Sequence, residues 1–434
     1  IDTLLDLGNN YVFADAPDLS PAIQIVRKTP PASEYLAQAA VFVKGEDITK
    51  FRGQLPEKLF TVSIHDQLDT GWRLTSKATQ AILTKLLGMG KPLNEVADGC
   101  LLYGVKTGFN EAFIINQATR NRLVMDDPSC ATLIKPVLRG EDLRPWYQEN
   151  EDRWLIFTRR GIDINNYPAI RDYLQQFREQ LEPRPDGWDE NKHRWPGRKA
   201  GTYKWYEIQD SVEYYEAFEQ TKILFPDITR KPRFSWGEPG IYLGNTGYFI
   251  PTDSHALLGI LASRTIWFVL SQISQPLGER DGTLIYRLFR QYMERLPIPS
   301  LTDPQRAHIG TLARQLTETA QQRYEARRKT TYRIAHDLGN PQAKLNQKLT
   351  TWWELSFKEF REELVKVFKR DILLRERDDW EALLRERTGD IAKLTSEIVR
   401  LETELNAAVY DVFGLNEEEQ GIIERETKYQ YGEW

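Results

Sequence analysis

The motif LPIPS at residues 296–300 divides the sequence into two parts with different periodicity. Before it, short runs of β-branched and aromatic residues alternate with helical stretches and with loops rich in Gly and Pro, a pattern typical of mixed α/β structure. After it, the chain is highly charged and its apolar residues recur at helical spacing. We therefore expect an α+β chain, in which a mixed α/β domain is followed by a bundle or coiled coil of long helices. Since 434 residues exceed what one core usually holds, several domains are expected.

The segment before residue 91 is predicted to contain two parts. Residues 1–45 alternate in strand fashion at 11–13 and 22–26, around the turn APDLSP, but bring too few strands for a sheet of their own. We interpret them as the C-terminal remnant of a preceding domain in a longer polypeptide. Residues 46–90 form a connector, with a helix from Ser76 to Leu87 that the following glycines end.

Residues 91–300 are expected to form the mixed α/β domain. Strands are predicted at 113–115, 154–157, 223–225 and 248–250. The segment 256–272 is apolar on all sides, which predicts one buried helix.

Residues 301–434 are expected to be helical, starting at an aspartate cap, Asp303, with a proline directly after it. A heptad stripe recurs at Ile391, Leu394, Ile398, Leu401 and Leu405. An antiparallel partner is predicted in the stretch around residues 357–367. Packing within a bundle is the simpler interpretation of so short a stripe, and a coiled coil that binds a protein partner is the alternative.

Composition excludes several classes of protein. No run of about eighteen apolar residues occurs, so we expect no membrane association. Two cysteines, Cys100 and Cys130, supply neither a disulfide framework nor a zinc site, which favours the cytoplasm. The net charge of −5 argues against a protein that coats nucleic acid without specificity.

Motifs for catalysis are missing, so no catalytic residue and no metal ligand is assigned. An adenine methyltransferase needs a glycine-rich cofactor turn and an Asn/Asp-Pro-Pro-Tyr/Phe loop that holds the flipped base. The nearest double proline, TPPA at 29–32, lacks both the acceptor side chain and the ring. Acidic residues and a lysine in 185–192 superficially resemble a nuclease site, but they lie in what is predicted to be a single loop.

Two clusters of cations and aromatic rings point to DNA. The stretch 192–206, KHRWPGRKAGTYKWY, mixes lysine, arginine and aromatic rings without an acidic residue, and 229–236, TRKPRFSW, follows an apolar strand. Cations neutralise phosphates, arginine pairs with guanine edges, and flat rings stack on sugars or bases. A solvated basic loop is the alternative for each cluster taken alone.

The order of several motifs resembles the TaqI-like C-terminal specificity domain of type II adenine methyltransferases and single-chain type IIG restriction enzymes. The motifs, which cover residues 90–300, are LYGVKTGFNEAFIIN at 102–116, LIKPVLRGEDLRPW at 133–146, NYPAI at 166–170, KILFPD at 222–227, LLGILAS at 257–263 and LPIP at 296–299. The resemblance implies a target-recognition domain that binds double-stranded DNA. It also implies that residues 1–45 end a methyltransferase domain.

The resemblance suggests which residues face DNA. It places Lys106, Thr107, Gly108 and Asn110 in a DNA-facing turn, and it puts base contacts on the loop with Arg230, Lys231 and Arg233. Further contacts are expected from Trp195, Arg198, Lys199, Lys204 and Trp205. Arg139 and Arg144 form a polar corner with Asp142, for which an internal Arg–Asp ion pair is the alternative to DNA contact.

The parent protein is thus expected to be an adenine-specific DNA methyltransferase of a type II restriction-modification system. This chain would bind no cofactor, S-adenosylmethionine belonging to the upstream methyltransferase domain. One alternative is a type IIG enzyme with an upstream nuclease domain and Mg²⁺. The other is a phage-defence assembly subunit that acts mainly through a protein partner on its C-terminal helices.

Overall fold

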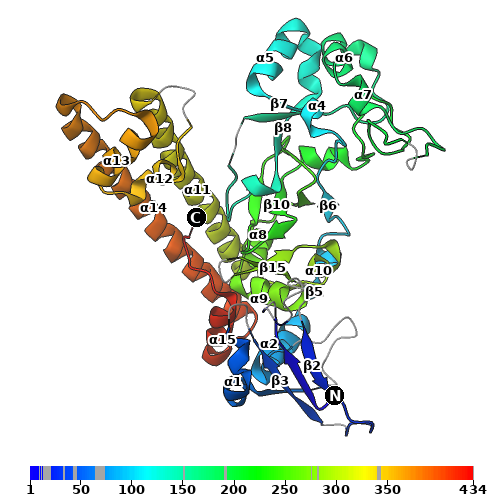
Figure 1. Cartoon of the computed structure of the whole chain (residues 1–434), viewed down its shortest axis with the longest axis vertical. Coiled ribbons are helices and arrows are strands. Elements are labelled where there is room, and N and C mark those ends of the chain that lie inside the picture. Colours follow the sequence, from blue (N-terminus) through cyan, green and yellow to red (C-terminus); the bar gives the residue numbers. More distant parts are fainter. Residues whose placement is uncertain are drawn as a thin grey trace.

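The computed structural model describes residues 1–8, 10, 12, 21–32, 35–42, 46–63, 74–149, 152–189, 193–274, 276–280, 283–339 and 344–433. Helices account for 49% of the residues and strands for 17%, with the long helices in the C-terminal third, which confirms the predicted α+β class. A mixed lobe, cyan to green, and a helical hairpin, yellow to red, diverge from a common base (Figure 1). We call the base the group of helices α2 (Lys77–Leu87), α8 (His255–Leu261), α9 (Arg264–Ile273) and α15 (Glu417–Thr427). The N-terminal sheet lies on the side of the base opposite to the lobe.

The N-terminal sheet has the strand order β2-β1-β3-β4. Its elements are β1 (Thr3–Asp6), β2 (Ala22–Ile25), β3 (Leu36–Val41), α1 (Phe51–Lys58) and β4 (Phe60–Ser63). β1 runs parallel to β3, and the other neighbours are antiparallel. The strand predicted at 22–26 is confirmed as β2, an edge strand whose four residues are all exposed. The strand predicted at 11–13 and its turn fall almost wholly outside the described residues.

A connector helix, α2 (Lys77–Leu87), leads from this sheet to the base of the molecule. Its start is fixed by Ser76, whose hydroxyl accepts a hydrogen bond from the amide of Thr79 at 3.1 Å. Ile82 and Leu86 are buried, so the predicted helix and its apolar face are confirmed. Beyond it come β5 (Lys91–Pro92) and α3 (Leu93–Val96), and β5 pairs with β17 (Pro297–Ile298).

The lobe contains two four-stranded sheets. One has the order β13-β8-β9-β7, from β13 (Tyr242–Leu243), β8 (Ile134–Leu138), β9 (Arg153–Ile156) and β7 (Ile114–Asn116). The other has the order β12-β10-β14-β6, from β12 (Ser235–Gly237), β10 (Lys222–Pro226), β14 (Gly247–Pro251) and β6 (Leu102–Tyr103). The four predicted strands of this domain therefore exist, as β7, β9, β10 and β14, with ends shifted by a residue or so.

Short helices cover the lobe, and a small third sheet joins it to the base. The helices are α4 (Asn110–Phe113), α5 (Gln117–Asp126), α6 (Pro168–Gln175) and α7 (Arg178–Leu181). The third sheet has the order β11-β16-β15, from β11 (Ile228–Thr229), β16 (Thr283–Arg287) and β15 (Pro276–Arg280). The loop with Arg230 and Arg233 therefore leaves one end of this small sheet and returns as β12.

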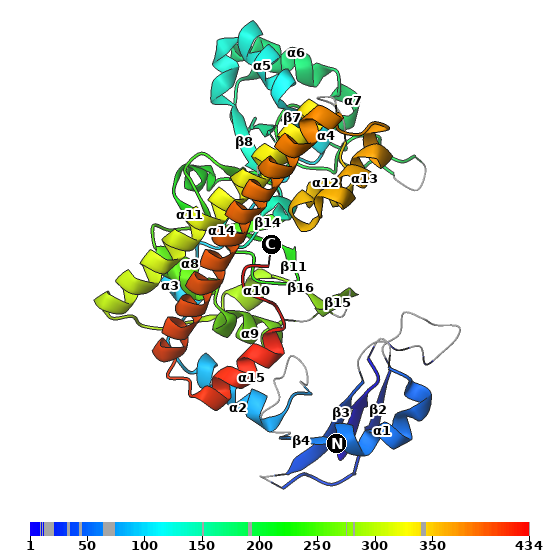
Figure 2. The same cartoon turned by 90° about the vertical axis from the view of Figure 1, so that its left-hand side faces the viewer.

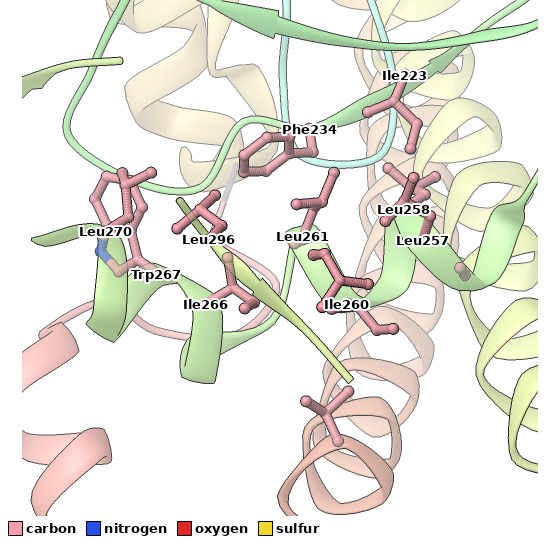
Figure 3. Close-up of a cluster of buried hydrophobic side chains, with 14 of the residues drawn as sticks. Ile223, Phe234, Leu257, Leu258, Ile260, Leu261, Ile266, Trp267, Leu270 and Leu296 are labelled. Atoms are coloured by element: carbon pink, nitrogen blue, oxygen red, sulfur yellow. The ribbon is translucent and has the colours of Figure 1, made fainter. Parts of the chain in front are cut away.

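The apolar segment 256–272 is buried, as predicted, but it forms two helices instead of one. These are α8 (His255–Leu261) and α9 (Arg264–Ile273), which meet at 54°. Ser263 causes the break, because its hydroxyl donates to the carbonyl of Ile260 and accepts from the amide of Ile266. Figure 3 shows side chains of both helices gathered with Phe234 and Leu296 in the core.

No single helix among the described residues has the length and apolar character that crossing a membrane requires. The bent pair α8 and α9 passes that test only when taken together, on length and composition alone.

A long helical hairpin forms the second arm. It consists of α11 (Asp303–Arg333), which continues as a π-helical turn over Ile334–Leu338, and α14 (Arg377–Val412). Between and after them lie α12 (Gln347–Thr350), α13 (Phe357–Phe368) and α15 (Glu417–Thr427), and α10 (Arg290–Met293) precedes the hairpin. Figures 1 and 2 both show α11 and α14 side by side along their length.

Two details of the helical prediction are wrong. The cap of α11 is Thr302, which forms a capping box with Gln305, and Asp303 is already inside the first turn. The main partner of α14 is α11; the stretch 357–367 contributes only to a smaller core at the tip, with Ile391. The C-terminal part of the stripe, Ile398, Leu401 and Leu405, packs into the core at the base of the molecule.

One hydrophobic core crosses residue 300, where the sequence changes character. It combines α2, β10, α8 and α9 with the near ends of α11 and α14. Gly259 on α8 shows how close the contact is, because a Cβ there would lie 2.8 Å from Ile309 and 3.2 Å from Leu405. The helical hairpin is therefore closely packed against α8.

Candidate nucleic-acid interface

The residues predicted to face DNA fall into two groups in the structure. The first joins the turn Lys106–Asn110 to the loop 193–209, because the amides of Gln209 and Asp210 donate to the carbonyls of Thr107 and Lys106. In the turn, the Thr107 hydroxyl donates to the side-chain oxygen of Asn110 at 2.7 Å and accepts from the amide of Phe109 at 3.2 Å. Thr107 is thus a buried structural residue, and Asn110 is exposed.

Gly108 fits this turn for two reasons. Its φ is +84°, and a Cβ would lie 2.7 Å from Gln209 and 2.8 Å from Arg198. Gly161 has a similar φ of +82° but open space around it. We expect Gly108→Ala to lower the free energy of unfolding by about 1–3 kcal/mol more than Gly161→Ala, because only Gly108 adds overpacking to backbone strain. Urea denaturation of both variants measures the difference, and equal losses would show that the crowding at Gly108 is relieved.

Arg198 supports the interior instead of contacting DNA as predicted. Its side chain is 4% exposed, and it donates to five backbone carbonyls. The acceptors are Leu181, Thr107, Glu207, Lys204 and Trp205. The guanidinium also lies 4.4 Å from the ring of Tyr203, and burial lowers the pKa of Arg198 to about 10. Its many donors tie the turn to the loop.

The neighbouring lysines are available to solvent. Lys199 and Lys204 are exposed. The pKa of Lys204 is raised, mainly by its interaction with the hydroxyl of Tyr206, so the ammonium stays charged at neutral pH. Lys106 and Asp210 are both half-buried; burial raises the pKa of the Asp210 carboxyl, and the positive charge of Lys106 opposes that shift. Lys192, at the start of the predicted cluster, lies outside the described residues.

Both predicted tryptophans are held half-buried in this loop. The Trp195 indole N–H donates to the carbonyl of Glu182 at 3.0 Å, and its ring meets Trp188 edge-on at 4.9 Å. The ring of Trp205 lies 4.3 Å from the Arg178 guanidinium. The structure thus gives the predicted cluster an interior arginine, fixed rings and two exposed lysines.

The second group joins the polar corner 139–149 to the loop between β11 and β12. The amide of Trp146 donates to the carbonyl of Phe234 at 2.9 Å, and the Gln148 side chain donates to the carbonyl of Trp236 at 2.6 Å. The corner therefore positions the loop from one side.

Both predicted arginines of the corner have acidic partners inside the chain. Arg139 pairs with Glu141 at 3.0 Å, and Arg144 pairs with Glu149 at 2.6 Å. Asp142 is buried, accepts from the amide of Arg139 at 2.6 Å and pairs with Arg153. An internal ion pair does hold this corner, as the alternative interpretation proposed, but Arg153 supplies its cation.

Positive charges accumulate in the loop itself. Arg230 and Arg233 are both half-buried, and the pKa of Arg233 is lowered to about 10 by burial and by the positive charges of Arg144 and Arg230. Lys231, by contrast, pairs with Glu433 at 2.5 Å with only 20% of its side chain exposed. This ion pair gives Lys231 an acidic partner within the chain.

Arg230 also lines a large groove of about 1070 Å³ that lies between the N-terminal sheet and the base. The groove is lined by Gln24 from β2, Gln272 from α9, Gln291 from α10, and by Arg295 and Lys428, with Asp6 and Glu426 as acidic residues. Sequence reasoning missed these residues because they are single polar residues far apart in the chain. Their side chains are of the types that contact phosphates and base edges.

The described residues contain no group of three or more His, Cys, Asp or Glu side chains arranged to hold a metal ion. Burial and the Asp127 carboxylate raise the pKa of Cys130 to about 11, so this thiol stays protonated. Asp186 lies in a loop, and residues 190–192, the rest of the nuclease-like pattern, fall outside the described residues.

Comparison with known proteins identifies two segments. Residues 135–298 match the TaqI-like C-terminal specificity domain, and residues 302–409 match a domain of unknown function, DUF8810. Among curated relatives, the chain is similar to the type II methyltransferase M.MjaIV of Methanocaldococcus jannaschii, at 22% identity over 49% of this chain and 69% of that protein. It is similar to the type II methyltransferase M.XhoI of Xanthomonas vasicola, at 25% identity over 68% of this chain and 53% of that protein.

Among solved structures, the type IIL restriction-modification enzyme MmeI in complex with DNA aligns with 92% of this chain and 41% of that chain, at 13% identity and a TM-score of 0.43. The chain thus spans less than half of MmeI and about half of M.XhoI. The family resemblance inferred from the ordered motifs is confirmed over the segment that holds β8, the polar corner and the Arg230–Arg233 loop. The comparisons therefore show that residues 135–298 match the TaqI-like C-terminal specificity domain and that the chain is similar in sequence to two type II methyltransferases.

Proposed function

We propose that this chain is the sequence-specific DNA-recognition region of an adenine-specific methyltransferase in a type II restriction-modification system. The match of residues 135–298 to a specificity domain carries this proposal. Double-stranded DNA is the ligand, and the chain holds it in register for a catalytic domain elsewhere in the parent protein. Adenine as the target base rests on the resemblance of the ordered motifs.

The distribution of charge supports a binding role. The chain as a whole has a net charge of −5, so attraction for DNA has to come from local surfaces. Lys199 and Lys204 supply exposed cations in the lobe, and Arg295 and Lys428 supply them in the groove. We assign phosphate contacts to these residues, and base contacts to Arg230, Arg233 and the groove glutamines.

S-adenosylmethionine, the methyl donor that the proposed activity needs, does not fit the residues of this chain. The sequence has neither a glycine-rich cofactor turn nor the Asn/Asp-Pro-Pro-Tyr/Phe loop. We place the cofactor, and Mg²⁺ if the parent protein also cleaves DNA, in domains outside residues 1–434. In this proposal, residues 1–45 end the methyltransferase domain.

Salt-dependent DNA binding tests the proposal. We expect the whole chain to bind duplex DNA with an affinity that falls steeply as salt rises, because counterions leave the phosphates. Lys199→Gln and Lys204→Gln should each weaken binding to all sequences alike and reduce the salt slope by about one unit. Lys393→Gln is the matched control, since Lys393 is an exposed lysine on α14, at 84% exposure. Fluorescence anisotropy with a randomised duplex measures these effects.

Two results would contradict the proposal. One is a chain that retains no duplex even at low salt. The other is an equal effect of all three lysine variants, since general charge would then explain the binding. If the first result came with a stable hetero-complex in light scattering, the assembly role would replace DNA recognition.

A further inference from the structure

A short segment after α15, residues 428–433, wraps around a buried arginine of α9. We call this segment the strap. The guanidinium of Arg264 lies against two of its rings, 4.3 Å from Tyr429 and 4.2 Å from Tyr431. Arg264 also donates to the carbonyl of Tyr429 at 2.5 Å and pairs with Glu424 at 2.8 Å. These contacts fix the strap to the base of the molecule, because Arg264 is itself held in helix α9.

A second anchor lies at Gly432. Its amide donates to Glu402 of α14 at 2.7 Å, and its carbonyl accepts from Arg323 of α11 at 2.8 Å. Its φ is +70°, and a Cβ would lie 2.7 Å from Val399, so a larger residue does not fit here. The other carboxylate oxygen of Glu402 accepts from the Trp146 indole at 2.8 Å. One buried carboxylate therefore joins the strap to the polar corner of the specificity domain.

The strap also meets the Arg230–Arg233 loop directly. Glu433 pairs with Lys231 at 2.5 Å. Next to that pair, Pro232 faces a narrow crevice whose walls include Trp146, Tyr429 and Tyr431. Two consecutive residues of the loop, one charged and one rigid, are thus in reach of the strap. Arg230 and Arg233 flank these two residues on either side.

We propose that the strap sets the position of the Arg230–Arg233 loop and so tunes which base the loop prefers. The inference rests on the proposed DNA recognition and adds a device for it, in which Lys231 and Glu433 are positioning residues. A half-exposed ion pair contributes little to stability, and Glu433 is 50% exposed. Removing it should therefore release the loop without unfolding the domain. Base readout is more sensitive, because a hydrogen-bonding arginine must be placed to within a fraction of an ångström.

Selection from randomised duplexes with charge-neutral variants of the whole chain tests the proposal. We expect Glu433→Gln and Lys231→Gln to reduce the preference at the same base position by about tenfold, the size of one lost base contact. The double variant should be no worse than either single one, since both remove one interaction. Glu433→Asp should restore part of the preference. Glu418→Gln is the matched control, because Glu418 is an exposed glutamate on α15 that belongs neither to the strap nor to the lining of the groove.

Thermal unfolding of each variant separates positioning from folding. The expected result is an altered sequence preference with an unchanged melting temperature. Preferences identical to wild type in both single variants, alongside normal DNA binding, would overturn the strap proposal and leave the proposed function intact. A melting temperature lowered in step with lost preference would also overturn it, since the strap would then act through stability alone. A wild-type chain without any DNA affinity would instead count against the proposed function.

Discussion

Arg198→Met is expected to lower the free energy of unfolding of the lobe by about 3–5 kcal/mol, even though methionine keeps much of the apolar stem. The reason is the loss of donors to five backbone carbonyls, which come from three separate segments of chain. Methionine offers none of these bonds. Urea denaturation followed by tryptophan fluorescence reports on this region, since Trp195 and Trp205 lie in the same loop.

Two variants test the explanation. Arg198→Lys keeps the charge but replaces a planar fork of donors with one ammonium, so it should recover only part of the loss. Arg171→Met removes an arginine that is 40% exposed on α6 and pairs with its neighbour Asp172. This control should change stability by less than about 0.5 kcal/mol. If Arg198→Met were as mild as Arg171→Met, the role given to Arg198 in the interior would be wrong.

Glu402→Leu is expected to have an effect of similar size, about 3–5 kcal/mol, at the junction between the specificity domain and the helical hairpin. The variant leaves the Trp146 indole and the Gly432 amide without their acceptor, and the buried charge of Arg323 loses a neighbouring carboxylate. Protease sensitivity of the strap should increase together with the loss of stability. Glu404→Leu is the control, because Glu404 is 42% exposed on the same helix.

Glu402→Gln should reveal the pH dependence of this junction. Burial raises the pKa of Glu402 above the ordinary value of 4.5, and the N–H donors only partly oppose this. A carboxyl group with a raised folded pKa stabilises the fold fully below about pH 4.5, and this contribution is lost as pH rises through the folded pKa. The stability difference between wild type and Glu402→Gln should therefore be largest in acid and shrink towards neutral pH. A difference that grows with pH would mean that the hydrogen bonds outweigh burial.

Local patterns were sufficient for several elements. The strands β7, β9, β10 and β14 and the helix α2 were all predicted, because their apolar spacing and their Gly, Pro and Ser boundaries act within a few residues. The break between α8 and α9 was missed, although Ser263 signals it, since the apolar pattern continues across the bend. The partner of α14 was misassigned because a heptad stripe specifies a packing face and not the helix that covers it.

The candidate site shows a different balance. Sequence reasoning found the segments, and the structure brings them together in two groups. Sequence reasoning did not separate the roles of neighbouring residues. Arg198 is buried and Lys199 is exposed, although they are adjacent in one basic run. Lys231 could not be distinguished from Arg230, because its partner Glu433 lies about two hundred residues further along the chain. Composition records how many charges a loop has and not which of them already have partners.

The sequence by itself determined the class of fold, the resemblance that the match over residues 135–298 confirms, and which loops carry cations and aromatic rings, since periodicity, capping and motif order are local properties of the chain. Only the tertiary structure decided which cations support the interior, which long helices pair, and how the strap reaches the Arg230–Arg233 loop. The physical reason is that burial and charge pairing depend on contacts between segments far apart in sequence, and these contacts are fixed by the shared core that packs the helical hairpin against the base of the lobe.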